Sequence, residues 1–133
     1  MIPKQIDSFL ASPAFGVVGA SSNPHKFGNK VLRCYLQHDR RAIPVNPKES
    51  AIEGVTCVSS ITDLPAEVKS ISMITPPAVT EQLVPLAIAK GIENIWMQPG
   101  AESPVAIALC RQHNINVIAD GSCLLVVLGY HDH

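Results

Sequence analysis

Five short apolar runs alternate with segments of helical pattern along this chain, and this alternation constrains its fold more than any other feature. Apolar runs of four or five residues are typical of strands that are buried on both faces of a parallel sheet. Strands that alternate with helices predict an α/β fold: a three-layer, Rossmann-type open sheet, mostly parallel, with helices on both faces. The expected strands are residues 15–19, 42–45, 70–74, 94–97 and 116–119.

The segments between these runs carry helix signals of their own. Apolar residues recur at helical spacing over 28–37, and Gly91 follows the next apolar stripe at a position where a left-handed C-cap is expected. Pro85 falls inside that second helix and is expected to kink it. Ser103, placed as an N-cap before a first-turn proline, begins another helix. A turn and a short strand are expected over 53–58, at the edge of the sheet.

Length and composition indicate one domain that spans residues 1–133. The 133 residues are 47% hydrophobic, which suits a single compact core and leaves no length for a second domain. Residues 1–12 are expected to contain a leading helix and residues 124–133 a C-terminal tail. No stretch approaches ~20 consecutive apolar residues, and the N-terminus lacks the apolar core of a signal peptide. We therefore expect a cytoplasmic protein.

Charge and cysteine spacing exclude several classes of function. The net charge is −1, from ten basic and eleven acidic residues without a long run of either sign, so we expect neither nucleic acid nor a membrane as a partner. The four cysteines and five histidines have no metal-ligand spacing, and neither a metal site nor a disulfide framework is expected. The expected partner is a small molecule, bound by a monomer or a homodimer.

The first apolar run leads into a loop of small and polar residues that opens a helix. The loop starts with Gly19-Ala20-Ser21-Ser22 and ends with Lys26-Phe27-Gly28. Backbone N–H groups at a helix N-terminus favour a phosphate, so the loop predicts a nucleotide-like ligand. Its glycines do not have the G-x-G-x-x-G spacing of an ordinary dinucleotide site. The two serines either bind this phosphate or cap the helix and satisfy turn amides.

A second candidate segment, Asn46-Pro47-Lys48, follows the second apolar run. In NAD-binding domains an acidic residue near this place binds the adenosine ribose. Here an amide and a cation take its place, and Lys48 could pair with a phosphate on the ribose. The segment therefore predicts an adenosine ligand with an extra phosphate, and both coenzyme A and NADP qualify.

Five motifs of this chain resemble those of the stand-alone CoA-binding domain proteins, which are related to the N-terminal domain of the succinyl-CoA synthetase alpha subunit. The resemblance implies a CoA site but not the chemistry of the synthetase, whose phosphorylated histidine lies in a further domain. Three departures stand out: the stand-alone proteins usually carry two basic residues where Thr75 and Pro76 stand, Leu at Pro99, and Asp-Arg-Cys near 120–123. The proline pair looks like the synthetase version. The matching motifs are residues 17–21, 44–47, 74–77, 95–100 and 119–123.

Four of these segments directly follow expected strands, so right-handed crossovers should bring them together at one edge of the sheet. Pro76 and Pro77 end a strand and start a helix, and contact with the ligand would be a second role. Cys123 either has a reactive thiolate near the thiol of CoA or fills the core as a small hydrophobe. The expected cofactor-binding residues are Gly19, Ala20, Ser21, Ser22, Lys26, Phe27, Gly28, Asn46, Pro47, Lys48, Thr75, Pro76, Pro77, Gln98, Pro99, Gly100 and Cys123.

The predicted function is binding of CoA or an acyl-CoA, in a binding or regulatory role, without catalytic activity of the domain alone. No catalytic residue is expected, because no nucleophile, base and orienting acid occur in a hydrolase-type motif. Two alternatives stay open: an NADP-dependent oxidoreductase, and an interaction module with a vestigial pocket. Gly19→Val and Ser21→Asp are each expected to abolish phosphate binding without unfolding the domain.

Overall fold

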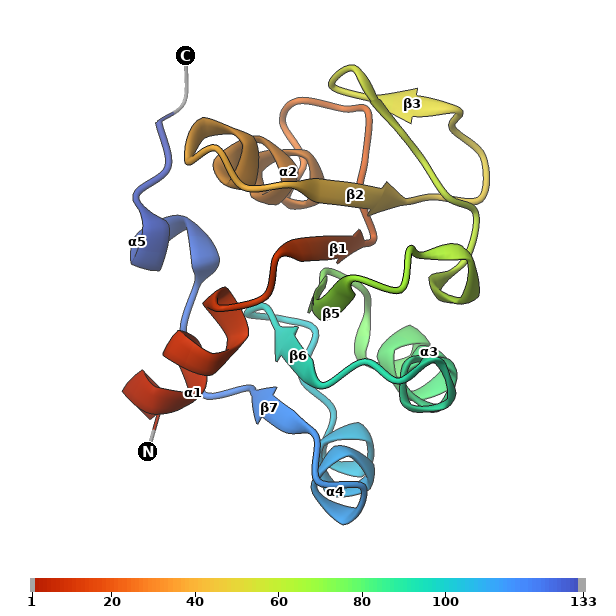
Figure 1. Ribbon diagram of the computed structural model, residues 1–133, viewed down its shortest axis with the longest axis vertical. Helices are drawn as coiled ribbons and strands as arrows, with labels where there is room; N and C mark the ends of the chain where they lie inside the picture. The colour runs from red at the N-terminus through yellow and green to blue at the C-terminus, as the bar shows by residue number, and fades with distance from the viewer. Residues whose placement is uncertain (1, 132–133) are drawn as a thin grey trace.

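The computed structural model describes residues 2–131, and a five-stranded parallel sheet forms its centre (Figure 1). The strand order is β2-β1-β5-β6-β7, and each pair of neighbours is parallel. This confirms the α/β fold with an open parallel sheet. All five expected runs lie within two residues of a strand: β1 (Ala14–Val18), β2 (Ala42–Val45), β5 (Val68–Met73), β6 (Asn94–Met97) and β7 (Asn116–Ile118).

Helices cover both faces of the sheet, which gives the three expected layers (Figure 1). Helices α3 (Pro77–Lys90) and α4 (Pro104–Gln112) pack on one face, together with the short 3₁₀ helix η1 (Ile61–Asp63). The opposite face carries α1 (Ile2–Leu10), α2 (Phe27–Gln37) and α5 (Leu124–Leu128).

Side chains that alternate along the buried strands pack into two separate hydrophobic cores, one on each face of the sheet. Phe15 and Val17 of β1 belong to the core beneath α1 and α2, whereas Val18 belongs to the core beneath α3 and α4. The first core is aromatic: the rings of Phe15 and Tyr35 stack with their centroids 4.7 Å apart. The buried hydroxyl of Tyr35 is 2.7 Å from that of Ser72, which satisfies both polar groups and ties α2 to β5.

The C-terminal segment is not the expected tail. Residues 124–128 form α5, and Leu124 is fully buried against the aromatic core. Its backbone N–H donates to Oε1 of Gln98 over 3.0 Å. Beyond the helix, the N–H of His131 donates to Oε1 of Gln37 over 3.0 Å, so α2 holds the segment that follows α5. Residue 1 of the expected leading helix and residues 132–133 of the tail lie outside the described part of the chain.

The segment 53–58 differs in detail from the expected edge strand. It contributes one strand of a separate antiparallel hairpin, β3 (Ala51–Ile52) and β4 (Val55–Thr56), and touches the sheet edge through the bridge between Val58 and Val45.

Pro85 lies inside α3, and the helix continues past it to Lys90. Glu81, whose carbonyl loses its helical donor, is exposed and can bond to water.

Candidate functional site

The order of the strands reverses between β1 and β5. From β1 the chain passes to β2 on one side, then returns across the sheet to β5 on the other side. Ligands of open α/β sheets bind at such a switch point, outside the carboxyl ends of the strands. The loops after β1, β2, β5 and β6 line three adjoining recesses here, as expected from the sequence.

Two glycines allow the loop after β1 to run close to the backbone around it. Gly19 has φ +94°, and a Cβ added to it would lie 2.2 Å from the carbonyl oxygen of Ile74. A Cβ at Gly28 would lie 2.1 Å from the carbonyl oxygen of Gly19. Both contacts are with backbone, which cannot move aside cheaply. The expectation that Gly19→Val spares the fold is therefore wrong, because the larger side chain would push β1 away from β5.

Side chains within the loop and from α2 hold its shape. Ser21 Oγ accepts from the N–H of Asn23 over 3.1 Å, which is the turn-amide role foreseen for the serines. The buried side chain of Asn29 donates from Nδ2 to the carbonyl of Ser21 over 2.9 Å. The N-cap of α2 is Lys26, not a serine, and it makes no side-chain cap. In the first turn of α2 the N–H of Asn29 donates to the carbonyl of Lys26 over 3.1 Å, which leaves the N–H groups of Phe27 and Gly28 for another acceptor.

The first of the recesses lies at this helix N-terminus and has a volume of about 440 Å³. Since α2 has no acidic residue in its first turn, no carboxylate of its own offsets the partial positive charge there. Lys26 adds a full positive charge at the rim. The recess is thus suited to an anion, and its lining consists of Gly19, Ala20, Ser21, Lys26, Phe27, Gly28 and Ile74.

Asn46 joins the loop after β2 to the loop after β1. Its Nδ2 donates to the carbonyl of Ala20 over 3.0 Å, and its Oδ1 accepts from the N–H groups of Lys48 (2.7 Å) and Glu49 (3.0 Å). A carboxylate in place of the amide would lose the donor to Ala20. Lys48 itself is exposed and lines none of the three recesses.

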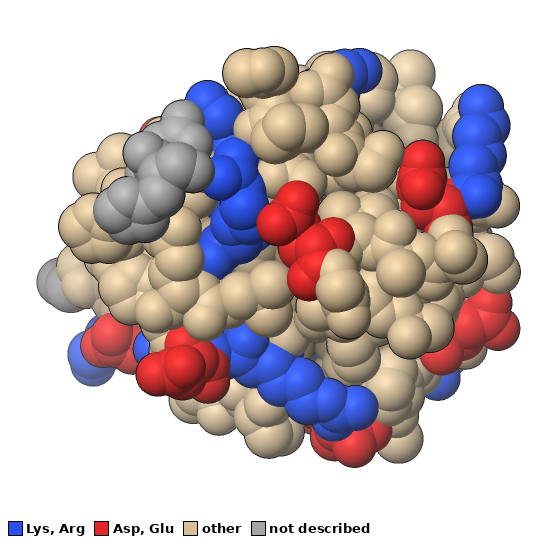
Figure 2. Space-filling view, turned by 90° about the horizontal axis from the view of Figure 1, so that it is seen from above, with Lys and Arg blue, Asp and Glu red and all other residues tan. Residues whose placement is uncertain are grey.

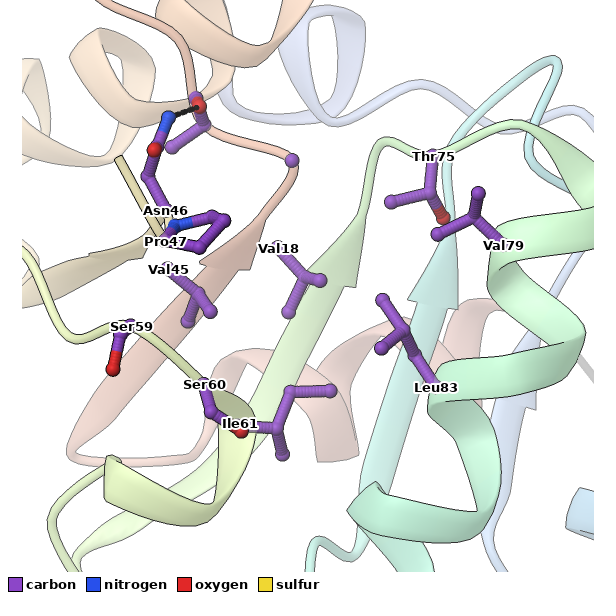
Figure 3. Close-up of a pocket in the computed structure, with 12 residues that line it drawn as sticks. Val18, Val45, Asn46, Pro47, Ser59, Ser60, Ile61, Thr75, Val79 and Leu83 are labelled. Atoms are coloured by element: carbon purple, nitrogen blue, oxygen red, sulfur yellow. Dashed lines mark hydrogen bonds between the residues drawn. The ribbon is translucent and has the colours of Figure 1, made fainter. Parts of the chain in front are cut away.

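A second, apolar recess of about 310 Å³ lies between the β2 loop and α3. Figure 3 shows the aliphatic side chains of Val18 and Val45 facing those of Val79 and Leu83 across this space, with Asn46 and Pro47 at its rim. Besides the strand residues Val18 and Val45, five residues of this recess were not expected at the site from the sequence: Ser59, Ser60, Ile61, Val79 and Leu83. The full lining is Val18, Gly19, Ala20, Val45, Asn46, Pro47, Ser59, Ser60, Ile61, Thr75, Val79 and Leu83.

A third recess of about 280 Å³ opens beside the ends of β5 and β6. It is lined by Ile74, Thr75, Pro76, Pro99, Gly100 and Ala101. Pro77 starts α3 next to it without lining it. The side chain of Gln98 points into the fold instead: it is fully buried and its Oε1 bonds to the N–H of Leu124.

The three recesses share parts of their walls. Gly19 and Ala20 line both the anion recess and the apolar recess, Ile74 lines the anion recess and the third, and Thr75 lines the apolar recess and the third. They therefore form one connected trough along the switch point. Twelve of the seventeen expected site residues line it; Ser22, Lys48, Pro77, Gln98 and Cys123 do not.

The cysteines differ in burial and hence in thiol acidity. Burial raises the pKa of both Cys34 and Cys110 to about 11, and it also raises the pKa of Cys57, with the charge of Glu49 as a second cause. Cys123 is half-buried and occupies the N-cap of α5 without a side-chain cap. All four are free thiols.

No helix within residues 2–131 is long and apolar enough to cross a membrane.

The model of the family described as CoA binding domain matches residues 14–128 of this chain. The alpha subunit of acetate–CoA ligase (ADP-forming) II from Pyrococcus furiosus is 26% identical over 91 residues, which are 68% of this chain and 20% of that protein. The chain thus spans about one fifth of the length of this curated relative.

Solved structures share the fold over most of the chain. A conserved hypothetical protein from Pyrococcus furiosus is 35% identical with a TM-score of 0.82, and the match covers 86% of this chain and 97% of that one. A hypothetical protein from Pyrococcus horikoshii is 25% identical with a TM-score of 0.87, over 95% and 88% of the two chains. A dinucleotide-forming acetyl-coenzyme A synthetase from Ca. Korarchaeum cryptofilum, at 21% identity, a TM-score of 0.73 and coverage of 82% and 26%, shares the fold alone.

Proposed function

The chain belongs to the CoA-binding domain family, and from this premise we propose that it binds coenzyme A or an acyl-CoA along the connected trough. The domain then has a binding or regulatory role and does not catalyse a reaction on its own. The observation that carries it is the continuity of the three recesses through Gly19, Ile74 and Thr75.

Each recess has the chemistry of one part of CoA. The apolar recess between the β2 loop and α3 offers aliphatic walls to the flat adenine ring, with polar groups only at its rim. The anion recess offers first-turn N–H groups of α2 to the diphosphate. The third recess, with its two prolines, offers a mainly apolar path for the pantetheine arm.

The trough supports binding rather than chemistry. Among the residues that line it, Lys26 is the one with a charged side chain, and none is a cysteine or histidine. General acid–base or nucleophilic catalysis needs at least a reactive group and a partner within hydrogen-bond reach. We therefore assign any transfer of the acyl group to another protein or domain. A cytoplasmic monomer or homodimer fits this role, and four free thiols are consistent with a reducing compartment.

CoA should bind more tightly than NAD, with NADP between them. The loop after β2 carries Asn46 and Lys48 where a carboxylate would bind an unphosphorylated ribose, and the exposed Lys48 would pair with a ribose phosphate that extends beyond the recesses. Calorimetric titration of CoA, dephospho-CoA, NADP and NAD tests this, and we expect about tenfold or more between CoA and NAD.

The same titration separates the alternatives. Equal or tighter binding of NAD contradicts the proposal, and tightest binding of NADP would favour an oxidoreductase-type site. Absence of binding by all four ligands would leave an interaction module with a vestigial pocket.

Cys123 should react with CoA disulfide faster than the other cysteines. Its thiolate would attack one sulfur of the disulfide, form a mixed disulfide with CoA and release the second CoA as a thiolate. Cys34 and Cys110 are buried with a raised pKa, so few of their thiols are ionised or accessible. Peptide mass mapping after a timed reaction measures the adduct at each cysteine. If the CoA adduct is spread evenly over the four cysteines, or is absent from Cys123, this residue has only a packing role.

A further inference from the structure

A carboxylate contacts the β1–α2 loop one residue beyond Ser21, which lines the anion recess. Ser22, one of the two serines of the β1–α2 loop, donates from Oγ to Oε1 of Glu49 over 3.1 Å. The two residues come from different loops, 27 positions apart in the sequence. Both side chains are exposed, so this contact is not needed to satisfy buried polar groups.

A backbone hydrogen bond fixes the position of Glu49 beside the β1–α2 loop. Its N–H donates to Oδ1 of Asn46 over 3.0 Å, and Asn46 in turn donates from Nδ2 to the carbonyl of Ala20 in the β1–α2 loop. Glu49 is therefore anchored to the loop that it faces. Its charge also reaches the other side of this segment, because it helps to raise the pKa of Cys57, after burial.

The charge of Glu49 opposes a phosphate bound in the anion recess. A negative charge close to the recess repels an anionic ligand. Because the whole chain carries a net charge of only −1, and Figure 2 shows acidic and basic side chains interspersed on the face seen from above, no general field outweighs such a local charge.

We propose that Glu49 limits the affinity of the CoA site, because its negative charge, held beside the β1–α2 loop by Ser22 and Asn46, repels the diphosphate of the ligand. This inference rests on the proposed function. It goes beyond that function because it assigns to an acidic side chain outside the trough lining an effect that opposes binding.

Glu49→Gln tests the effect of the negative charge. Glutamine keeps an oxygen that can accept from Ser22 and removes the negative charge. We expect the variant to bind CoA and dephospho-CoA about fivefold more tightly, the factor given by one unit charge a few ångströms away in a water-like medium. Pantetheine has no phosphate, and its affinity should not change. The gain should shrink as the salt concentration is raised.

Glu93→Gln is the matched control. It removes the same charge from an exposed residue that precedes β6, at the end of the sheet opposite the trough. Its CoA affinity should equal that of the parent. Calorimetry on the parent and both variants measures these affinities. The role of Glu49 is overturned if Glu49→Gln binds CoA no more tightly than Glu93→Gln does. It is also overturned if the affinity rises for CoA but not for dephospho-CoA, or rises equally for pantetheine. If the parent protein binds neither CoA nor dephospho-CoA, the proposed function is wrong, and the role of Glu49 is wrong as well.

Discussion

Ser21→Asp is expected to fold like the parent protein and to bind CoA about 30-fold more weakly or worse. Ser21 lines the anion recess, and its Oγ accepts from the N–H of Asn23. An aspartate oxygen can accept from the same N–H, so the turn should keep its shape. The added negative charge would then face the ligand's diphosphate, and a like-charge contact near a protein surface costs about 2 kcal/mol or more.

Ser21→Asn is the control, because asparagine has the shape of aspartate and the same acceptor without the charge. We expect its CoA affinity to stay within about threefold of the parent, which is under 1 kcal/mol. Thermal unfolding and calorimetric titration of CoA and pantetheine measure both properties. Equal loss of CoA affinity in the two variants would show that shape, not charge, matters at this position. Unchanged CoA binding by Ser21→Asp would place the diphosphate elsewhere.

The strands were predictable because buried parallel strands are apolar on both faces. The runs 42–45 and 94–97 match β2 and β6 to the residue. Helix ends carrying explicit signals were also predictable: Gly91 adopts the left-handed C-cap of α3, and Ser103 Oγ accepts from the N–H of Ala106 at the start of α4. In each case the deciding interaction lies within a few residues of sequence.

Helix α5 was missed because its local sequence does not specify a helix. The run Leu124-Leu125-Val126-Val127-Leu128 has no polar face and contains two β-branched residues. Its helical form depends on distant partners, namely Gln98, which accepts from the first N–H group, and α2, on which it packs. Such tertiary contacts cannot be derived from the periodicity of five residues.

The trough was predicted as a set of loops but not as a shape. Its loop residues follow strands and could be found from the sequence, whereas Ile61 and Leu83 enter it because η1 and α3 pack together over the end of the sheet. Glu49 was missed for the same reason, since its contact with Ser22 depends on how two loops approach each other. Lys48 was assigned by analogy of position, and the side chain lies outside the recesses.

Gly19→Ala is expected to lower the free energy of unfolding by about 2–4 kcal/mol, from two causes that add. At φ +94° a side chain is strained, at a cost of about 1 kcal/mol. The new Cβ would also lie 2.2 Å from the carbonyl oxygen of Ile74, so the end of β5 would have to move, with a further cost of about 1–3 kcal/mol. The movement would disturb the trough as well, since Gly19 and Ile74 both line the anion recess.

Gly91→Ala separates the two causes, because Gly91 has φ +92° and nothing within 4 Å of an added Cβ. The same methyl group at nearly the same φ should therefore cost only the strain, about 1 kcal/mol. Urea denaturation measures both free energies of unfolding. In thermal unfolding we expect Gly19→Ala to lower the Tm by about 10 °C, clearly more than Gly91→Ala does. CoA affinity should fall only in Gly19→Ala. Similar losses of stability in the two variants would mean that backbone strain alone accounts for this glycine, and that β1 and β5 can part enough to admit a side chain.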